Sequence, residues 1–493
     1  MKRLLIASTA LSLLGGAALA GGHVTQEKNE WYKAAQQELK AKMAVAPITS
    51  KAKNIILLIA DGNGVGSNYA TRLYQGQQKG GYGDENVMFK EQLPHLALVK
   101  TYNTNAQTPD SAGTGTAMHS GVKTKAGVVG VDETLNRGDC SAVASARVDS
   151  IAEILSGQGK AVGVVSTARL THATPASAYA HAADRNFEDD SKLPEDCTTP
   201  DIASQLITAM DKGIVDLAMG GGRRHFLPKE ATDEEGKNGK RTDGKNLIET
   251  ARSSGVQYAW DDVSAKRLKL DGSPILALFE SSHMKYEHDR TGEPSLAEMT
   301  EKAIKALSND KDGYFLSIEA GRVDHASHDS NLHRTVTDGV AFDEVVRVAM
   351  EMTSPEDTLI IVTADHEHAL AFNGYCGRGT PITGLCYGIN ADGEKHTGEL
   401  NLANDGKPYS VATFANGIGS ILSEGGQGSR PVVTQDEAVD PDYVQQALIP
   451  LDYETHSGED VAVYARGPWA HLLNGTVEQN FIFHVMMQAA HSH

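Results

Sequence analysis

Near-continuous runs of Val, Ile and Leu recur along the chain, with stretches of helical character between them. A strand buried on both faces reads as such a run rather than as an alternation, which is typical of parallel sheets covered by helices on both faces. The runs at 54–60, 96–102, 161–166, 217–219, 314–318, 358–363 and 461–464 predict its strands. We therefore expect an α/β fold with a mainly parallel central sheet, in which ligands bind beyond the carboxyl ends of the strands.

Three segments depart from this pattern. Residues 371–449 change to Gly, Asn, Thr and Asp, which predicts an inserted subdomain, and residues 229–245 are polar like a surface excursion. Residues 27–45 have helical character and predict an arm ahead of the first strand, which packs either on its own core or on a partner subunit. Apolar side chains of this arm recur at i, i+4 spacing on one stripe: Trp31, Ala35, Leu39 and Met43.

The first twenty residues have the charged, apolar and small-residue order of a cleavable secretory signal. Lys2 and Arg3 precede an apolar run, which ends at Ala20 in a small-residue site. We expect a signal peptide at 1–20, a helical arm at 21–50 and a catalytic domain at 51–493, in the periplasm or outside the cell. No later stretch approaches the ~20 apolar residues of a membrane span, so no membrane insertion is expected.

Composition and charge narrow the classes of partner. Hydrophobic residues make up 40% of the chain and charged residues 22%, which is enough to bury a large core. Removing Lys2 and Arg3 with the signal takes the net charge from −19 to −21, and such a surface repels nucleic acid and anionic lipid. Any anionic substrate must be attracted locally, by metals or arginine. The acidity fits salt tolerance, and it equally fits exported bacterial proteins in general.

The four cysteines are Cys140, Cys197, Cys376 and Cys386. An even number in an exported chain favours two disulfides, most simply Cys140 with Cys197 and Cys376 with Cys386. The spacing does not resemble a zinc ribbon, so these cysteines are interpreted as structural.

Acidic residues stand where predicted strands end. NIILLIADGNG places Asp61 at one strand end, GYFLSIEAGRVDHASH places Glu319 at another, and TLIIVTADHEH places Asp365 and His366 at a third. Carboxylates crowded at one edge of a sheet must take up protons or bind cations. We expect cations.

Further ligands lie nearby in the sequence. Asp324 and His328 are four residues apart and would share one face of a helical turn, and His456 precedes the last predicted strand. Carboxylate with imidazole suits zinc, whereas an oxygen-only set of Asp61, Glu319 and a threonine hydroxyl suits magnesium.

The candidate nucleophile is Ser111, in TPDSAGTGTAMHSG at a small-residue helix start. Free backbone N–H groups and the helix dipole favour negative charge there, on a serine alkoxide and on a bound phosphoryl group. Serine at a helix start is usually only a cap, so the motif has weight only beside the metal ligands.

Seven segments in this order resemble the motif series of the alkaline phosphatases. They are NIILLIADGNGVG, KTYNTNAQTPDSAGTGTA, VGVVSTARLTHATPASAYAHAADRN, LAMGGGRR, FLSIEAGRVDHASHDSN, TLIIVTADHEH and THSGEDVAVYARGP. An ordered series is far more specific than any single pattern. The resemblance implies a phosphomonoesterase with two Zn²⁺ and one Mg²⁺ per subunit, in which Ser111 is phosphorylated and Arg185 grips the outer phosphate oxygens.

The same resemblance assigns the metal ligands. The first zinc site takes Asp324, His328 and His456; the second takes Asp61, Asp365, His366 and Ser111; magnesium takes Asp61, Thr174 and Glu319. His172 and His325 stand beside these sites where well-studied bacterial members carry aspartate and lysine and animal members carry histidine. His368, His491 and His493 are set aside as non-ligands.

Three more expectations follow from the resemblance. LFESSHMKYE resembles the neighbourhood of an additional divalent ion in animal members, with Glu280 and Glu293 as its candidate ligands. A homodimer is implied, with residues 371–449 as a crown at its interface. Phosphate monoesters are expected to be accepted with low specificity, because the recognised group is the phosphoryl.

Two rival functions are a related esterase, either a sulfatase or a phosphodiesterase, and a binding protein without turnover. A sulfatase would need a Cys/Ser-x-Pro-x-Arg setting, which Ser111-Ala112-Gly113 lacks, and a phosphodiesterase usually replaces the magnesium set, which is present here. An exported metal- or phosphate-binding protein without turnover is the other rival, and it would have no use for Ser111.

Overall fold

The computed structural model describes residues 25–422 and 428–491. The predicted signal peptide at 1–20 and His493 lie outside the described residues. The chain divides into two compact units, Met1–Ala46 and Pro47–His493. In the first, a 3-10 turn at Thr25–Lys28 precedes α1 (Glu30–Met43), which Asn29 caps by accepting a hydrogen bond from the Tyr32 N–H at 3.2 Å. The helix predicted for this arm is confirmed.

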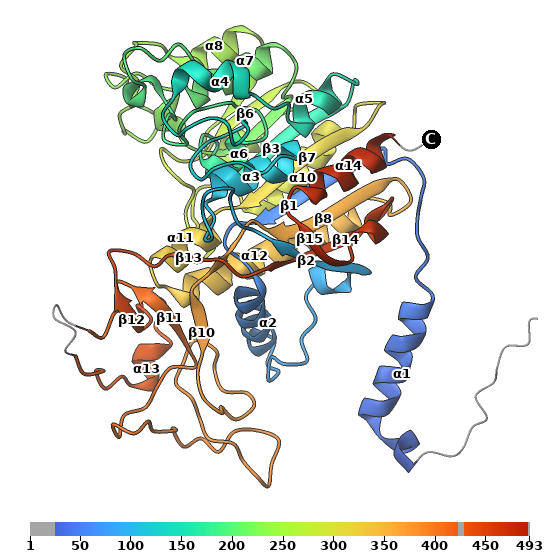
Figure 1. Ribbon diagram of the computed structural model, residues 1–493, viewed down its shortest axis with the longest axis vertical. Helices are drawn as coiled ribbons and strands as arrows, with labels where there is room; N and C mark the ends of the chain where they lie inside the picture. The colour runs from blue at the N-terminus through green and yellow to red at the C-terminus, as the bar shows by residue number, and fades with distance from the viewer. Residues whose placement is uncertain (1–24, 423–427, 492–493) are drawn as a thin grey trace, which may run out of the picture. The chain divides into compact units, whose positions relative to one another are not determined.

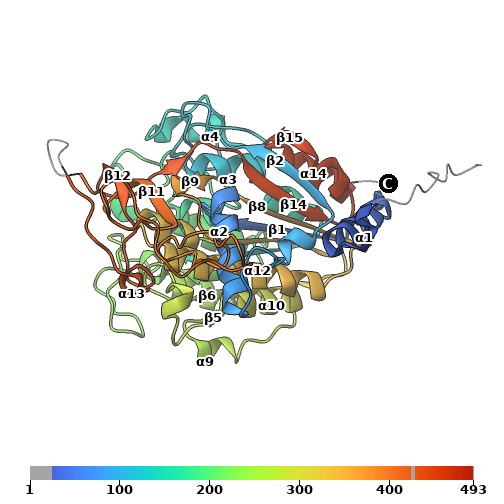
Figure 2. The same cartoon turned by 90° about the horizontal axis from the view of Figure 1, so that it is seen from below.

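One ten-stranded sheet forms the centre of the second unit, in the order β15-β2-β14-β8-β1-β7-β3-β4-β6-β5 (Figures 1 and 2). Its strands are β1 (Asn54–Ala60), β2 (His95–Lys100), β3 (Ala161–Arg169), β4 (Leu217–Gly221), β5 (Gln257–Ala259), β6 (Ile275–Leu278), β7 (Tyr314–Ala320), β8 (Thr358–Ala364), β14 (Val461–Arg466) and β15 (Gly475–Glu478). Only β14 runs antiparallel to its neighbours, β2 and β8. The predicted mainly parallel α/β sheet is confirmed.

Helices cover both faces of this sheet. The helices of the second unit are α2 (Val65–Gln78), α3 (Ser111–Ser120), α4 (Val143–Ala146), α5 (Ile151–Ser156), α6 (Ala173–Ala176), α7 (Ile202–Asp211), α8 (Leu247–Ser253), α9 (Asp262–Ala265), α10 (Leu296–Leu307), α11 (Arg322–His328), α12 (Leu332–Glu351), α13 (Gln435–Ala438), which belongs to the insertion, and α14 (Phe481–His491). Successive side chains of β1 point to opposite faces. Leu57 packs in the core with α5 and α14, and Leu58 in the core with α10 and α12. Burial on both faces explains the unbroken apolar run of β1.

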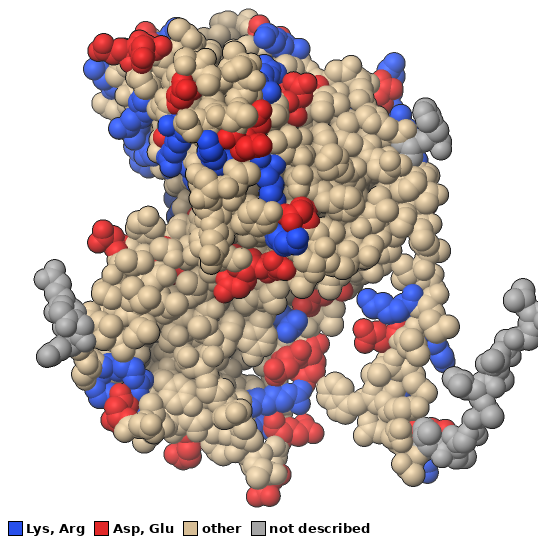
Figure 3. Space-filling view, viewed as in Figure 1, with Lys and Arg blue, Asp and Glu red and all other residues tan. Residues whose placement is uncertain are grey.

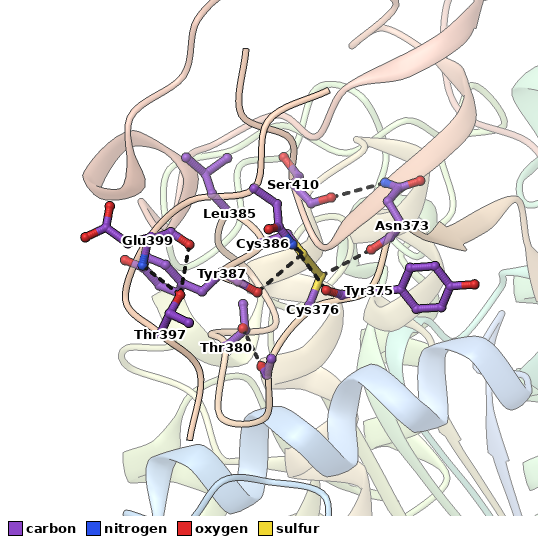
Figure 4. The surroundings of a disulfide bond; sticks show 12 residues. Asn373, Tyr375, Cys376, Thr380, Leu385, Cys386, Tyr387, Thr397, Glu399 and Ser410 are labelled. Atoms are coloured by element: carbon purple, nitrogen blue, oxygen red, sulfur yellow. Dashed lines mark hydrogen bonds between the residues drawn. A yellow bond between two sulfur atoms is a disulfide. The ribbon is translucent and has the colours of Figure 1, made fainter. Parts of the chain in front are cut away.

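The predicted inserted segment carries a sheet of its own. Its strands are β10 (Leu370–Phe372), β11 (Ala412–Gly417) and β12 (Ala447–Pro450). A further two-stranded ladder pairs β9 (Glu367–His368) with β13 (His456–Ser457). The Cys376–Cys386 disulfide ties two loop segments of the insertion together, and Figure 4 shows Tyr375 pointing away from it. Both predicted disulfides, Cys140–Cys197 and Cys376–Cys386, are confirmed.

The description of residues 229–245 as a surface excursion was wrong for Arg241, which is fully buried. Its guanidinium donates to Asp201 at 2.9 Å and to Asp243 at 2.6 Å. A buried charge needs such partners because removing it from water is costly. The ion pair therefore holds this segment against the rest of the domain, which its polar composition did not indicate.

On the face shown in Figure 3, side chains of both charges are scattered over a mostly uncharged surface. Among the described residues, no helix is both long and apolar enough to cross a membrane.

Candidate functional site

The carboxyl ends of β1, β7 and β8 bring three carboxylates together. Ala60, the last residue of β1, pairs with Ala320 on one side and with Ala364 on the other. Asp61 and Asp365 therefore leave the sheet at the same level, beside Glu319. Their side chains are almost completely buried. The structure brings the three acidic residues together as predicted, although Glu319 lies within β7 rather than after it.

Burial and mutual repulsion oppose ionisation of this trio. Burial, and then Asp324 and Glu319, raise the pKa of Asp61 well above its usual range. Burial raises the pKa of Glu319 to about 7, and burial with the charge of Asp61 raises that of Asp365 to about 6. Without a cation, the cluster holds protons into the neutral range.

Three buried oxygens have no hydrogen-bond partner within the part of the chain that the structure describes: Asp61 Oδ2, Glu319 Oε1 and Thr174 Oγ1. Unpaired buried polar atoms are costly, so each needs a partner that protein atoms do not provide. An all-oxygen donor set suits a hard cation such as Mg²⁺. These are the three side chains that the resemblance of the motifs assigned to magnesium.

A second cluster joins Asp324 to imidazoles. Asp324 Oδ1 lies 3.2 Å from His328 Nε2, one turn along α11, and 3.2 Å from His456 Nε2. His366 Nε2 lies 3.3 Å from both Asp61 and Asp365, and its ring stacks on that of His456 at 3.5 Å. Asp61, Asp365 and His366 form one potential metal-ligating group, and Asp324, His366 and His456 belong to another. Mixed carboxylate and imidazole donors suit zinc.

The pKa values of this second cluster follow its charges. Burial alone would raise the pKa of Asp324, but His328 and the other imidazoles hold it well below its usual range. Burial and the neighbouring His366 lower the pKa of His456 to about 4. Above neutral pH, His456 is therefore an uncharged imidazole with a lone pair free to bind metal.

Ser111 begins α3 next to both clusters. Its Oγ lies 3.3 Å from Asp61 Oδ1 and 3.1 Å from His366 Nε2. Asp110 caps the helix by accepting from the Gly113 N–H at 3.1 Å. Gly113 is required because a Cβ there would lie 2.2 Å from the Asn103 amide, which itself accepts from the Asp110 N–H. The helix dipole points its positive end at Ser111.

Arg185 and Ser111 line the same cavity, which has a volume of about 350 Å³. Its guanidinium contacts Asp110 Oδ2 and His172 Nε2, each at 3.1 Å. The cavity is lined by Thr108, Ser111, His172, Arg185, Asp324, His325, His328, Tyr453, Thr455 and His456. A guanidinium held in this way can bind two oxygens of a tetrahedral anion at once.

Several site residues escaped the sequence analysis. His368, which it set aside, lies inside the second cluster with Nε2 2.9 Å from Asp324 and Nδ1 2.5 Å from Glu454. Glu367 is buried and accepts from the Gly66 N–H and the Ser67 hydroxyl. The alternation in DHEH was the available signal, because a two-residue strand brings every second side chain to one side. His491 hydrogen-bonds Gln158, away from the clusters.

The candidates for an additional ion, Glu280 and Glu293, are both buried. Glu280 lies 3.5 Å from the Lys237 ammonium and 3.4 Å from that of Lys285. Burial raises the pKa of Glu293 to about 7. Among the described residues, neither belongs to a group of three or more potential metal-ligating side chains.

A serine at a helix start, two clusters of potential metal ligands and an arginine around one cavity are the groups that a metal-dependent hydrolase with a serine nucleophile requires. Comparison with known proteins agrees. The family model for alkaline phosphatase matches residues 52–492. The tissue-nonspecific alkaline phosphatase of Gallus gallus is 39% identical over 477 residues, which cover 93% of this chain and 89% of that protein; the Homo sapiens enzyme is 37% identical over 500 residues, covering 97% and 92%.

Solved structures share the fold. The alkaline phosphatase of Thermus thermophilus superposes with a TM-score of 0.63 at 22% identity, covering 90% of this chain and 92% of that one. That of the Antarctic bacterium TAB5 gives 0.61 at 23% identity, covering 90% and 98%. The chain belongs to the alkaline phosphatase family and is a phosphomonoester hydrolase.

Proposed function

We propose that this chain hydrolyses phosphate monoesters through a covalent phosphoserine on Ser111, at a centre for two Zn²⁺ and one Mg²⁺. The observation that carries the proposal is the position of Ser111 Oγ, within 3.3 Å of Asp61 and His366 at the N-terminus of α3. A capping serine needs no such neighbours.

The ligand sets are proposed from donor chemistry. Asp324, His328 and His456 would hold the first zinc; Asp61, Asp365 and His366, with Ser111, the second; and Asp61, Thr174 and Glu319 the magnesium. The unpaired oxygens of Asp61, Thr174 and Glu319 support the magnesium set. Bound there, the ions would neutralise the buried carboxylates and draw electron density from the phosphate and from the oxygens that exchange at phosphorus.

The protein groups then have separate roles in two displacements. Ser111 Oγ attacks phosphorus and the bond to the leaving alcohol breaks; water next attacks the phosphoserine from the vacated side, which releases phosphate and restores Ser111. The α3 dipole stabilises negative charge on Oγ. Arg185, steadied by Asp110, binds two of the oxygens that do not exchange and spreads their charge.

His368 is proposed to orient Asp324 rather than to bind metal. Both of its nitrogens face carboxylates, Asp324 and Glu454. Burial would lower the pKa of His368, but Glu454 and Asp324 raise it well above its usual range. A protonated imidazole has no lone pair for a metal and donates at both nitrogens.

The remaining proposals concern location and assembly. The two disulfides are consistent with a periplasmic or secreted protein. We also propose that residues 371–449 form a crown and, with the arm at 21–50, contribute to a homodimer. The three-stranded sheet of the insertion and the apolar stripe of α1 support this arrangement.

The experiment compares the mature wild-type chain with Ser111→Ala. Phosphate release from a chromogenic monoester at alkaline pH should vanish with a chelator, return with Zn²⁺ and Mg²⁺, and fall by at least about 10³-fold in the variant. Sulfate ester and phosphodiester turnover are measured in parallel. A metal-loaded, folded Ser111→Ala protein with near wild-type turnover would refute the role of Ser111, and faster diester than monoester hydrolysis would favour the rival enzyme.

A further inference from the structure

Three imidazoles gather beside the catalytic cavity, outside the proposed ligand sets. His172 precedes α6, His325 lies on α11, and His283 lies in the loop after β6. Each offers a ring nitrogen, and the three nitrogens all lie within 4.8 Å of one another. The ring centroids of His283 and His325 are 4.0 Å apart, and that of His172 is 5.3 Å from His283. The sequence analysis did not single out His283.

The nitrogens of this trio lack suitable partners. Nδ1 of His172 and Nδ1 of His325 are buried without a hydrogen-bond partner among the described residues. His283 faces N–H donors at both nitrogens: Nδ1 lies 3.3 Å from the Arg169 backbone N–H, and Nε2 contacts the Arg169 guanidinium. A neutral imidazole accepts at one nitrogen only, so one of these contacts sets donor against donor. All three rings therefore have a nitrogen in want of a partner.

Neighbouring charges do not exclude a cation. The Arg169 guanidinium is paired with both carboxylate oxygens of Glu188, at 2.7 and 2.8 Å. The Arg185 guanidinium is paired with Asp110. Both positive charges are thus balanced by a carboxylate. A third, on Arg322, also acts on His283 and His325, and at His325 the negative charge of the neighbouring Asp324 outweighs it.

We propose that His172, His283 and His325 bind an additional transition-metal ion of the zinc class. Three imidazole donors favour zinc and its neighbours in the series over Mg²⁺ or Ca²⁺, which prefer oxygen. Tetrahedral zinc with bonds of about 2.0–2.1 Å places its nitrogens about 3.3 Å apart, so side-chain rotations must close the trio by at most about 1.5 Å. His172 and His325 line the cavity, so water could supply a fourth ligand. This site goes beyond the proposed function, because it requires neither turnover nor any of the catalytic ligands.

The test measures the amount of bound zinc per chain and does not depend on activity. Wild-type enzyme, His283→Asn and the control His396→Asn, which changes a partly buried imidazole of the insertion, are equilibrated with micromolar Zn²⁺ and millimolar Mg²⁺. Bound metal is measured by elemental mass spectrometry. Wild type and His396→Asn should retain about one zinc per chain more than His283→Asn. Equal zinc contents in folded wild-type and His283→Asn proteins would overturn the proposal.

A second measurement does not depend on the variant folding. Crystals of the wild-type enzyme equilibrated with zinc should give an anomalous scattering peak at the zinc edge between the three imidazoles. Peaks confined to the proposed catalytic sites would overturn the proposal, even where His283→Asn proved unstable.

Discussion

Glu319 should make the metal-free enzyme less stable as the pH rises from 5 to 8, while buried imidazoles with a lowered pKa, such as His456, act in the opposite direction. Glu319 is buried, and its pKa rises from 4.5 in the unfolded chain to about 7 in the fold. A group whose pKa is raised by folding stabilises the fold fully below its unfolded pKa, and this contribution disappears as the pH rises through the folded pKa. The stability from Glu319 is therefore lost between about pH 4.5 and pH 7. Asp365, with a pKa raised to about 6, acts in the same direction.

The size of the effect follows from the pKa difference. Each pKa unit corresponds to about 1.4 kcal/mol, so Glu319 contributes about 3 kcal/mol to the free energy of unfolding below pH 4.5, and about 2 to 3 kcal/mol is lost between pH 5 and pH 8. Glu319→Gln removes this titration. The fall caused by Glu319 should then be absent, so between pH 5 and pH 8 the variant should gain about that amount of stability relative to wild type, whereas Glu133→Gln, at an exposed position, should behave as wild type.

Urea unfolding of the chelated proteins, followed by tryptophan fluorescence at several pH values, measures this difference. Adding Zn²⁺ and Mg²⁺ should abolish most of the fall, because bound cations keep the carboxylates ionised without repulsion. The reasoning fails if chelated wild type and Glu319→Gln show the same change in the free energy of unfolding between pH 5 and pH 8.

Three further changes have defined outcomes. Arg185→Lys should lower kcat/KM for a monoester by about 10-fold or more, because the bidentate fork is lost; steady-state kinetics test this, and an unchanged value would exclude the proposed grip. His368→Asn should weaken zinc retention about 10- to 100-fold in competition with a chelator, through misorientation of Asp324, and unaltered retention would contradict that role. Replacing Cys140 and Cys197 by serine should cost about 4 kcal/mol in urea unfolding against about 3 kcal/mol for Cys376 and Cys386, since the first loop is longer; a reversed order would count against loop entropy as the cause.

Much of the fold could be predicted from the sequence, because strands buried on both faces are apolar at nearly every position. The long central strands β1, β7 and β8 appear as unbroken apolar runs. Three short strands of the central sheet escaped prediction: β5, β6 and β15 have only three or four residues each. Runs of that length carry no period that separates them from loops, so their pairing is decided by the neighbouring strand.

The proposed site was predictable in its parts. Asp61 and Asp365 follow apolar runs, and the four-residue spacing of Asp324 and His328 needs only one turn of helix. No pattern along the chain indicated that His368 contacts Asp324 and Glu454. These contacts join residues 44 and 86 positions apart, so only packing brings them together.

The sequence by itself determined the α/β class, the acidic strand ends, the two disulfides and the family, because each depends on local composition, on cysteine pairing or on ordered motifs. The tertiary structure decided which polar atoms around the cavity are left without partners among the described residues, including the oxygens of Asp61, Thr174 and Glu319 and the nitrogens of His172 and His325. Whether a polar atom has a hydrogen-bond partner depends on distances in three dimensions, which the spacing of residues along the chain does not encode. His283 acquires its place only when the loop after β6 folds against α11 and the start of α6.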